Sequence, residues 1–478
     1  MTLDNKEIAV PKRILNTLLS SLSAGVVPRS GAPYIAIGRK DEINSLLDNL
    51  DDTAEGGSFC RFLIGRYGSG KSFLIQLIRG YALDRGFICA DADLSPERRL
   101  TGGGGAGIAT YRELMINIAS KASPEGGALP TVLSRHFIKL KAELVEKGIM
   151  PDDAAFESEL KKKVYATLSE LEGDVGGFDF ARVLGEYYIA LMQDQNEKKT
   201  ACLRWLRGEF ANKTEAISAL GFRVSTVIDD DNWYNFIKLL ASLSVKLGYS
   251  GLIVFIDECV NLYKIPNRIS REANYEKLLA IFNDTLQGKA QSLGVIFGGT
   301  PQFLEDTRRG LFSYDALKSR LADSRYSELG YQNLSSPVIR LRRLSDNELL
   351  ALVKRLTKLY AQREGMSNLP LTDSEIEIFL TRALARAGAE EMVTPREIIR
   401  DYLTLLNILR DNKDATFAQI MSNISFSRSE GESPTADRQH SEPAVTQGIS
   451  APDRGLASQH TETAEKPKQK INLFDIDI

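Results

Sequence analysis

The eight residues from Gly65 to Ser72, GRYGSGKS, constrain this 478-residue chain more than any other segment. They fit the pattern G-x-x-x-x-G-K-[ST], in which successive backbone N–H groups surround an anion because glycines place no Cβ in the way. The apolar run 59–64 predicts a strand before this loop. Residues 73–78 predict a helix after it, whose positive N-terminal end faces the anion. The segment therefore predicts a phosphate-binding loop in an α/β fold.

Every residue of this loop is a candidate contact to a nucleoside triphosphate. The eight candidates are Gly65, Arg66, Tyr67, Gly68, Ser69, Gly70, Lys71 and Ser72. Lys71 would place a positive charge on the β- and γ-phosphates, and the Ser72 hydroxyl would bind Mg²⁺. The loop thus predicts a bound triphosphate together with a magnesium ion.

A second apolar run, residues 251–256, ends in the two acids Asp257 and Glu258. A continuous apolar run of this length is typical of a strand that is covered on both faces. In a chain with a phosphate loop, Asp257 is the candidate ligand of Mg²⁺, directly or through water. Glu258 is the candidate general base that polarises the attacking water. The two acids predict hydrolysis of the bound triphosphate.

Other candidates follow the later strands. Thr300 ends the apolar run 293–299, and its hydroxyl could reach the γ-phosphate or the attacking water, although Gly-Gly-Thr-Pro also suits a plain turn. A transferred phosphoryl group needs a cation to stabilise its developing charge. For this role we favour Arg320 and Arg325, which lie between the fourth and fifth predicted strands. Arg396 begins a later helix, from which it could reach back to the nucleotide.

Composition argues against several other classes of site. The net charge of −3 gives no global case for binding nucleic acid, although a local basic patch is compatible with it. Of three histidines, only His136 lies in the predicted folded part, so a Ser-His-Asp hydrolase or a His-rich metal site is poorly supported. The four cysteines are widely separated, which predicts buried, reduced thiols and a cytoplasmic location. We expect no signal peptide and no membrane-spanning segment.

Hydrophobic periodicity predicts four parts. Residues 1–32 form an N-terminal amphipathic helix and linker, and residues 33–344 form the P-loop core. In this core, strands that alternate with helices predict a parallel five-stranded sheet. The mostly helical, charged segment 110–245 is inserted into it. Residues 345–426 form a small all-α domain.

The remaining residues, 427–478, predict a disordered tail, because residues 427–470 contain no Phe, Trp or Tyr with which to build a core. The tail ends in the apolar, acid-flanked segment Ile471–Ile478. This segment is either a docking motif that adds a strand to a partner's sheet or a plain chain end.

Two glycine-containing segments near the loop are less clear. An apolar run that ends in Gly38-Arg39 precedes the loop strand; it suits either a contact to the adenine or a turn with a solvated charge cluster. Four consecutive glycines, residues 102–105, indicate a mobile connection and no second nucleotide site.

Together these motifs resemble the AAA+ ATPases, whose layout is a phosphate loop, an Asp-Glu strand, a polar sensor after the fourth strand and a helical lid with Thr-Pro-Arg. In this chain the lid motif is Thr394-Pro395-Arg396, and residues 38–43 look most like the origin-recognition branch. A closer resemblance is to a bacterial ATP-binding family that is found in BREX phage-defence loci and beside TerB-type helicases. It covers about residues 10–410 and is carried by residues 22–28, 96–100, 124–129 and 313–317.

This resemblance implies an AAA+ core with a C-terminal all-α lid, ATP as the nucleotide and ATP hydrolysis. It also implies a homo-oligomer that works beside a helicase or another defence-system protein. Three hypotheses remain open: a nucleotide-dependent switch in a defence complex, which we favour, a DNA-binding motor or helicase loader, and a nucleotide-gated scaffold with little turnover. The chain leaves little room for a winged helix before the tail, which argues against autonomous sequence-specific DNA binding.

Overall fold

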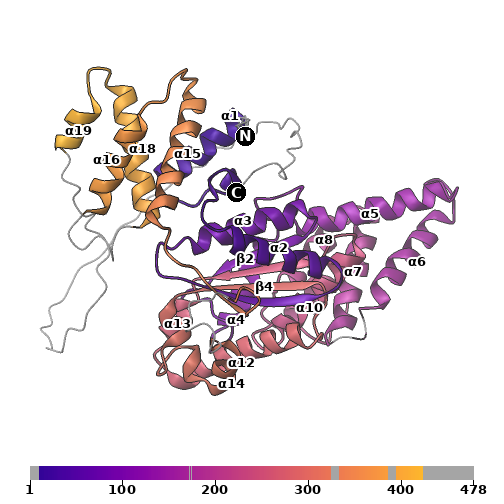
Figure 1. The fold of residues 1–478 in the computed structure, drawn as a ribbon. Helices are drawn as coiled ribbons and strands as arrows, with labels where there is room; N and C mark the ends of the chain where they lie inside the picture. Colours follow the sequence, from indigo (N-terminus) through magenta and orange to yellow (C-terminus); the bar gives the residue numbers. More distant parts are fainter. Residues whose placement is uncertain (1–9, 172, 174, 324–332, 386–393, 424–478) are drawn as a thin grey trace, which may run out of the picture.

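One parallel sheet forms the centre of the protein (Figure 1). The computed structural model describes residues 10–171, 173, 175–323, 333–385 and 394–423. Within these residues the strands follow the order β2-β3-β4-β1-β5, and all four pairings are parallel. The strands are β1 (Ser58–Ile64), β2 (Ile88–Asp93), β3 (Leu252–Asp257), β4 (Leu293–Gly299) and β5 (Val338–Arg340). The prediction of a parallel five-stranded sheet is confirmed.

Helices cover both faces of the sheet, because successive side chains of a strand point to opposite faces. On β1, Phe59 and Leu63 pack with α2 and α3, whereas Cys60 and Phe62 pack on the face that α4, α10 and α12 cover. The helices around the sheet, on its two faces together, are α2 (Lys40–Ala54), α3 (Lys71–Asp84), α4 (Ala106–Ile116), α10 (Trp233–Lys246), α11 (Val260–Tyr263), α12 (Arg268–Leu286), α13 (Pro301–Glu305) and α14 (Asp315–Leu321), with the short 3₁₀ helices η1 (Ala32–Ile35) and η2 (Leu311–Ser313). All four cysteines are buried free thiols, as predicted.

A group of helices is inserted between β2 and β3. Its helices are α5 (Leu129–Glu146), α6 (Phe156–Ser169), α7 (Gly177–Met192), α8 (Asn196–Leu206) and α9 (Lys213–Leu220). Buried aromatic side chains hold it together; the rings of Phe137 on α5 and Tyr188 on α7, for example, stack with their centres 5.7 Å apart. Its core is continuous with one face of the sheet, and α5 and α6 project away from the sheet (Figure 1). None of the helices in the described ranges is long and apolar enough to cross a membrane.

His136 lies on α5 within this inserted group and is 6 % exposed. Its ring packs 6.1 Å from the ring of Tyr188, and its Nδ1 atom has no hydrogen-bond partner among the described residues. Burial, helped by the nearby charge of Lys139, lowers the pKa of His136 to about 4. The imidazole is therefore a neutral packing residue, in keeping with the absence of any predicted catalytic role.

We expect His136 to make folding stability depend on pH. Above pH 6.5 the imidazole is neutral in both states, whereas between pH 6.5 and 4 only the unfolded chain takes up the proton, so stability falls as pH falls. These two pKa values correspond to a loss of about 2 kcal/mol between pH 7.5 and pH 5. His136→Phe keeps a ring and removes the titration. Urea unfolding at both pH values should show a smaller loss for the variant, and equal losses would contradict the prediction.

A second, smaller core lies in a helical body formed by α1 (Lys12–Ser23), α15 (Asp346–Glu364), α16 (Asp373–Leu384), α18 (Pro395–Asp411) and α19 (Phe417–Asn423). The helix predicted near the N-terminus is confirmed as α1, and its leucine face packs against α15 and α18 (Figure 1). Reciprocal capping boxes begin α15, α16 and α18, which fixes where these helices start.

The chain passes between the helical body and the sheet part twice. Residues 36–39 lead from η1 into α2, and residues 341–345 lead from β5 into α15. Since η1 contributes to both cores, the first passage is packed on both sides. The two passages bring the helical body next to the carboxyl edge of the sheet, where the site described below lies.

Candidate functional site

The predicted phosphate loop joins the end of β1 to the start of α3. Gly70 takes the N-cap position of α3 with φ +91°, a left-handed conformation that favours glycine. No side chain caps this helix. Its first backbone N–H groups are therefore available to an anion, which the positive end of the helix also attracts.

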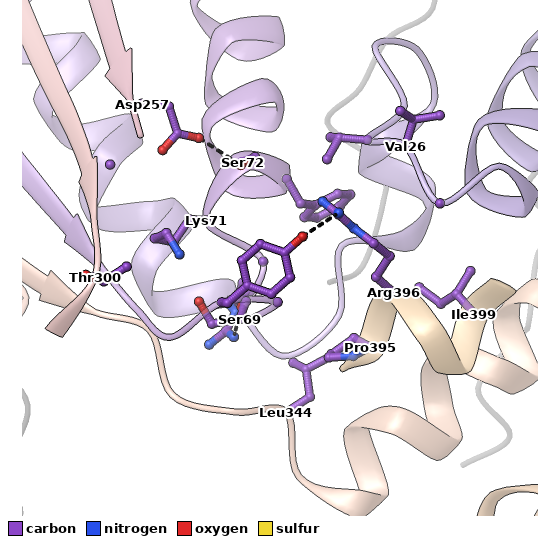
Figure 2. A pocket seen from close by; sticks show the side chains of 18 of the residues that line it. Val26, Ser69, Lys71, Ser72, Asp257, Thr300, Leu344, Pro395, Arg396 and Ile399 are labelled. Carbon is purple, nitrogen blue, oxygen red and sulfur yellow. Dashed lines mark hydrogen bonds between the residues drawn. The ribbon is translucent and has the colours of Figure 1, made fainter. Parts of the chain in front are cut away.

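Lys71 and Ser72, the first two residues of α3, face the end of β3 (Figure 2). The Lys71 ammonium donates hydrogen bonds to the carbonyl oxygens of Gly65, at 2.9 Å, and of Arg66, at 3.1 Å. Burial lowers the pKa of Lys71, and nearby carboxylates oppose this shift. The Ser72 hydroxyl donates to Oδ2 of Asp257 at 2.7 Å. The fold thus brings the two sequence motifs into direct contact.

The two acids occupy different environments. Asp257 is 8 % exposed at the end of β3, and its Oδ1 atom accepts a hydrogen bond from the backbone N–H of Glu258 at 2.8 Å. Glu258 has an exposed side chain and φ +56°, which is uncommon for a residue other than glycine. Such backbone strain often accompanies functional sites. On the neighbouring strand, a Cβ at Gly298 would lie 2.2 Å from Oδ1 of Asp257, so only glycine fits there.

Thr300 follows β4, and its position bears on the two alternatives that the sequence left open. Its hydroxyl caps α13 by accepting a hydrogen bond from the N–H of Phe303 at 3.3 Å. Thr300 also lines the same cavity as Lys71 (Figure 2). Glu258 is part of this lining as well. A local structural role and a place at the site are therefore both compatible with its position.

The structure describes two of the three predicted arginines and places them differently. Arg396, in the first turn of α18, lines the cavity, and its Nη1 atom donates to the Tyr67 hydroxyl at 3.4 Å (Figure 2). Arg320 lies exposed on α14, donates to the carbonyl oxygen of Ala316 and does not line this cavity. Arg325 lies outside the described residues, as does the terminal segment 471–478.

The phosphate loop, the two acids, Thr300 and Arg396 surround a cavity of about 660 Å³ between the sheet part and the helical body. One side is polar and carries the loop and the acids. The other side is apolar and includes Val26, Val27, Pro28, Ile35, Ile37, Leu344, Leu352 and Ile399. The sequence offered one part of this wall, the apolar run before Gly38, as a possible contact to the adenine, and Ile35 and Ile37 of that run line the cavity. The rest was missed, because its residues come from segments more than 300 positions apart that no local pattern connects. An apolar wall beside a phosphate loop suits the flat base of a nucleotide.

The sequence left open whether Arg39 is solvated or lies beside the nucleotide. It is 4 % exposed, and its Nη2 atom donates to the carbonyl oxygens of Ser69, at 3.0 Å, and of Arg342, at 2.5 Å. Its Nη1 atom pairs with Glu42 at 3.3 Å. Arg39 and Glu42 are therefore buried, whereas Lys40 and Asp41 of the same charge cluster are exposed. Arg39 ties the phosphate loop to both passages between the sheet part and the helical body.

The donor set suits magnesium. Within the described ranges, no group of three or more His, Cys, Asp or Glu side chains is arranged to hold a metal. Ser72 and Asp257 nevertheless present two adjacent oxygen ligands. Mg²⁺ is commonly held by one or two such ligands together with phosphate oxygens and water. The residues present therefore fit a magnesium ion that arrives with a nucleotide.

Comparison with known proteins agrees with this geometry. The profile of the family described as BREX system ATP-binding protein BrxC/D matches residues 10–425, which include every described strand and helix. No curated protein matches the chain. The matched range extends slightly beyond the resemblance seen in the sequence motifs. The chain belongs to the BREX system ATP-binding protein BrxC/D family.

Proposed function

We propose that this protein binds ATP with Mg²⁺ at residues 65–72 and hydrolyses it, using an AAA+ core that the helical body closes as a lid. The observation that carries the proposal is the 2.7 Å hydrogen bond between Ser72 and Asp257, which joins the phosphate loop to the acidic strand. Membership of a family of ATP-binding proteins supports ATP as the nucleotide.

The proposal gives a role to the phosphate loop, to the two acids and to Thr300. Lys71 and the N–H groups at the start of α3 hold the phosphates. Ser72 and Asp257 would hold Mg²⁺, which supplies positive charge to the phosphate oxygens when it is bound. Glu258 accepts a proton from the attacking water, and Thr300 orients that water.

Positive charge at the γ-phosphate comes from two directions. Arg396 reaches the cavity from α18 of the same chain. Arg320 lies on the surface, away from the cavity of its own chain, as expected of a residue that acts in a neighbouring subunit. We therefore propose a homo-oligomer in which Arg320 or Arg325 of one subunit completes the site of the next.

The biological role follows from the family. BREX systems defend bacteria against phage, and the members of this family are their ATP-binding proteins. We propose that the protein acts in the cytoplasm as a nucleotide-dependent switch: ATP orders a defence complex, and hydrolysis resets it. A helicase or another protein of the same system is the proposed partner, with Ile471–Ile478 as a candidate docking segment.

Turnover measurements test this role. The full-length protein should hydrolyse ATP slowly alone and several-fold faster when another protein of the same defence system is added. Duplex or single-stranded DNA alone should not stimulate it. Stimulation by DNA alone would favour a motor or helicase loader. Tight ATP binding without hydrolysis under any of these conditions would leave only the nucleotide-gated scaffold.

A further inference from the structure

Tyr67 is the largest side chain of the phosphate loop, and 70 % of it is exposed. Its hydroxyl accepts the hydrogen bond from Arg396, drawn in Figure 2, and the guanidinium carbon lies 5.9 Å from the centre of its ring. The loop and α18 also touch at the next residue, because a Cβ at Gly68 would lie 2.3 Å from the methyl group of Thr394. The start of α18 therefore rests directly on the phosphate loop.

Arg396 faces the cavity without a carboxylate partner among the described residues, and its guanidinium donates to the Tyr67 hydroxyl. Three further cations, Arg39, Lys71 and Lys264, line the same cavity. A guanidinium has five N–H donors, and Tyr67 uses one of them. The remaining donors stay free for an anion, and the neutral phenol does not compete with that anion for the charge.

We propose that Tyr67 is a positioning residue that holds Arg396 over the phosphate loop, so that the guanidinium is already in place when the γ-phosphate of ATP arrives. This inference rests on the proposed function. A long arginine side chain loses rotamer freedom when it binds a ligand, and a side chain held in advance loses less. Tyr67 therefore strengthens ATP binding through Arg396 and contributes little to the binding of ADP, which lacks the γ-phosphate.

A double-mutant cycle on the full-length protein tests this inference. The variants are Tyr67→Phe, which keeps the ring and removes the hydroxyl, Arg396→Ala, and the two combined. Equilibrium titration with fluorescent ATP and ADP analogues measures the dissociation constants. We expect Tyr67→Phe to weaken ATP binding by about threefold to tenfold, the range expected for one side chain whose ordering is lost. The dissociation constant of this variant for ADP should stay within about twofold of the wild-type value.

The decisive comparison is the combined variant. If Tyr67 acts through Arg396, adding Tyr67→Phe to Arg396→Ala should weaken ATP binding no further, because coupled residues are non-additive. Two control variants should leave both constants unchanged. Arg400→Ala removes an arginine one turn along α18 that pairs with Asp401, and Tyr165→Phe removes an exposed hydroxyl on α6.

Additive effects, or equal losses for ATP and ADP, would overturn the inference, because Tyr67 would then act on another part of the nucleotide or on the fold. An Arg396→Ala variant that binds ATP normally would overturn it as well. In each of these outcomes the wild-type protein still binds nucleotide. A wild-type protein that binds neither analogue would instead overturn the proposed function itself, so the two failures are distinguishable.

Discussion

The Lys71→Ala variant should bind ATP about a hundredfold or more weakly than the wild-type protein. Lys71 would make charge-assisted hydrogen bonds to two phosphates, each worth about 1.5–3 kcal/mol, and alanine can make neither. Isothermal titration with Mg²⁺ and ATP measures the loss directly. In the nucleotide-free protein Lys71 also supports the loop through the carbonyl oxygens of Gly65 and Arg66. Thermal unfolding of the variant should therefore accompany the titration.

A matched control is Lys161→Ala, which removes a lysine on α6 whose partner is Glu157. This variant should bind ATP as the wild type does. If Lys71→Ala is folded and still binds ATP within a few-fold of the wild type, the residues 65–72 do not form the proposed site.

The Glu258→Gln variant should keep ATP binding and lose turnover by about 10²–10⁴-fold, the usual contribution of a general base. Glutamine has nearly the same shape and cannot accept the proton from water. The backbone N–H of Glu258 would still donate to Asp257, so the arrangement of the magnesium ligands should not change. Phosphate release and ATP titration on the same sample separate the two effects.

Glu272→Gln serves as the control for this variant, because Glu272 lies on α12, pairs with Arg268 and does not line the cavity. Its turnover should equal that of the wild type. Unchanged turnover in Glu258→Gln would show that another group removes the proton from water, and weakened ATP binding would show that Glu258 holds the nucleotide.

Local patterns predicted the sheet and the loop because each depends on neighbouring residues. A buried parallel strand needs a continuous apolar run, and the runs 59–64, 251–256 and 293–299 became β1, β3 and β4. The phosphate loop needs glycines and a lysine at fixed spacing, so residues 65–72 could be recognised as this loop without knowledge of any tertiary contact. The opening of α18 was equally local, since Thr394 and Glu397 form its capping box across three residues.

The parts that sequence reasoning missed depend on residues far apart in the chain. The glycine segment 102–105 predicted only a connection, yet the Asp230 carboxylate accepts hydrogen bonds from the N–H groups of Gly102, Gly107 and Ile108. More than 120 residues separate Asp230 from these groups. Arg39 bonds to the carbonyl oxygen of Arg342 across 303 positions. A single sequence without tertiary information gives no signal for such pairs.

The paired passages between the sheet part and the helical body have a mechanical consequence. A body attached at one point can swing in any direction, whereas a body attached at two neighbouring points turns only about the line that joins them. Residues 36–39 and 341–345 are two such points, and Arg39 bridges them while it also holds the carbonyl oxygen of Ser69. We therefore expect the proposed lid to rotate about the line that joins these two passages, while Arg39 keeps the phosphate loop attached beside that line.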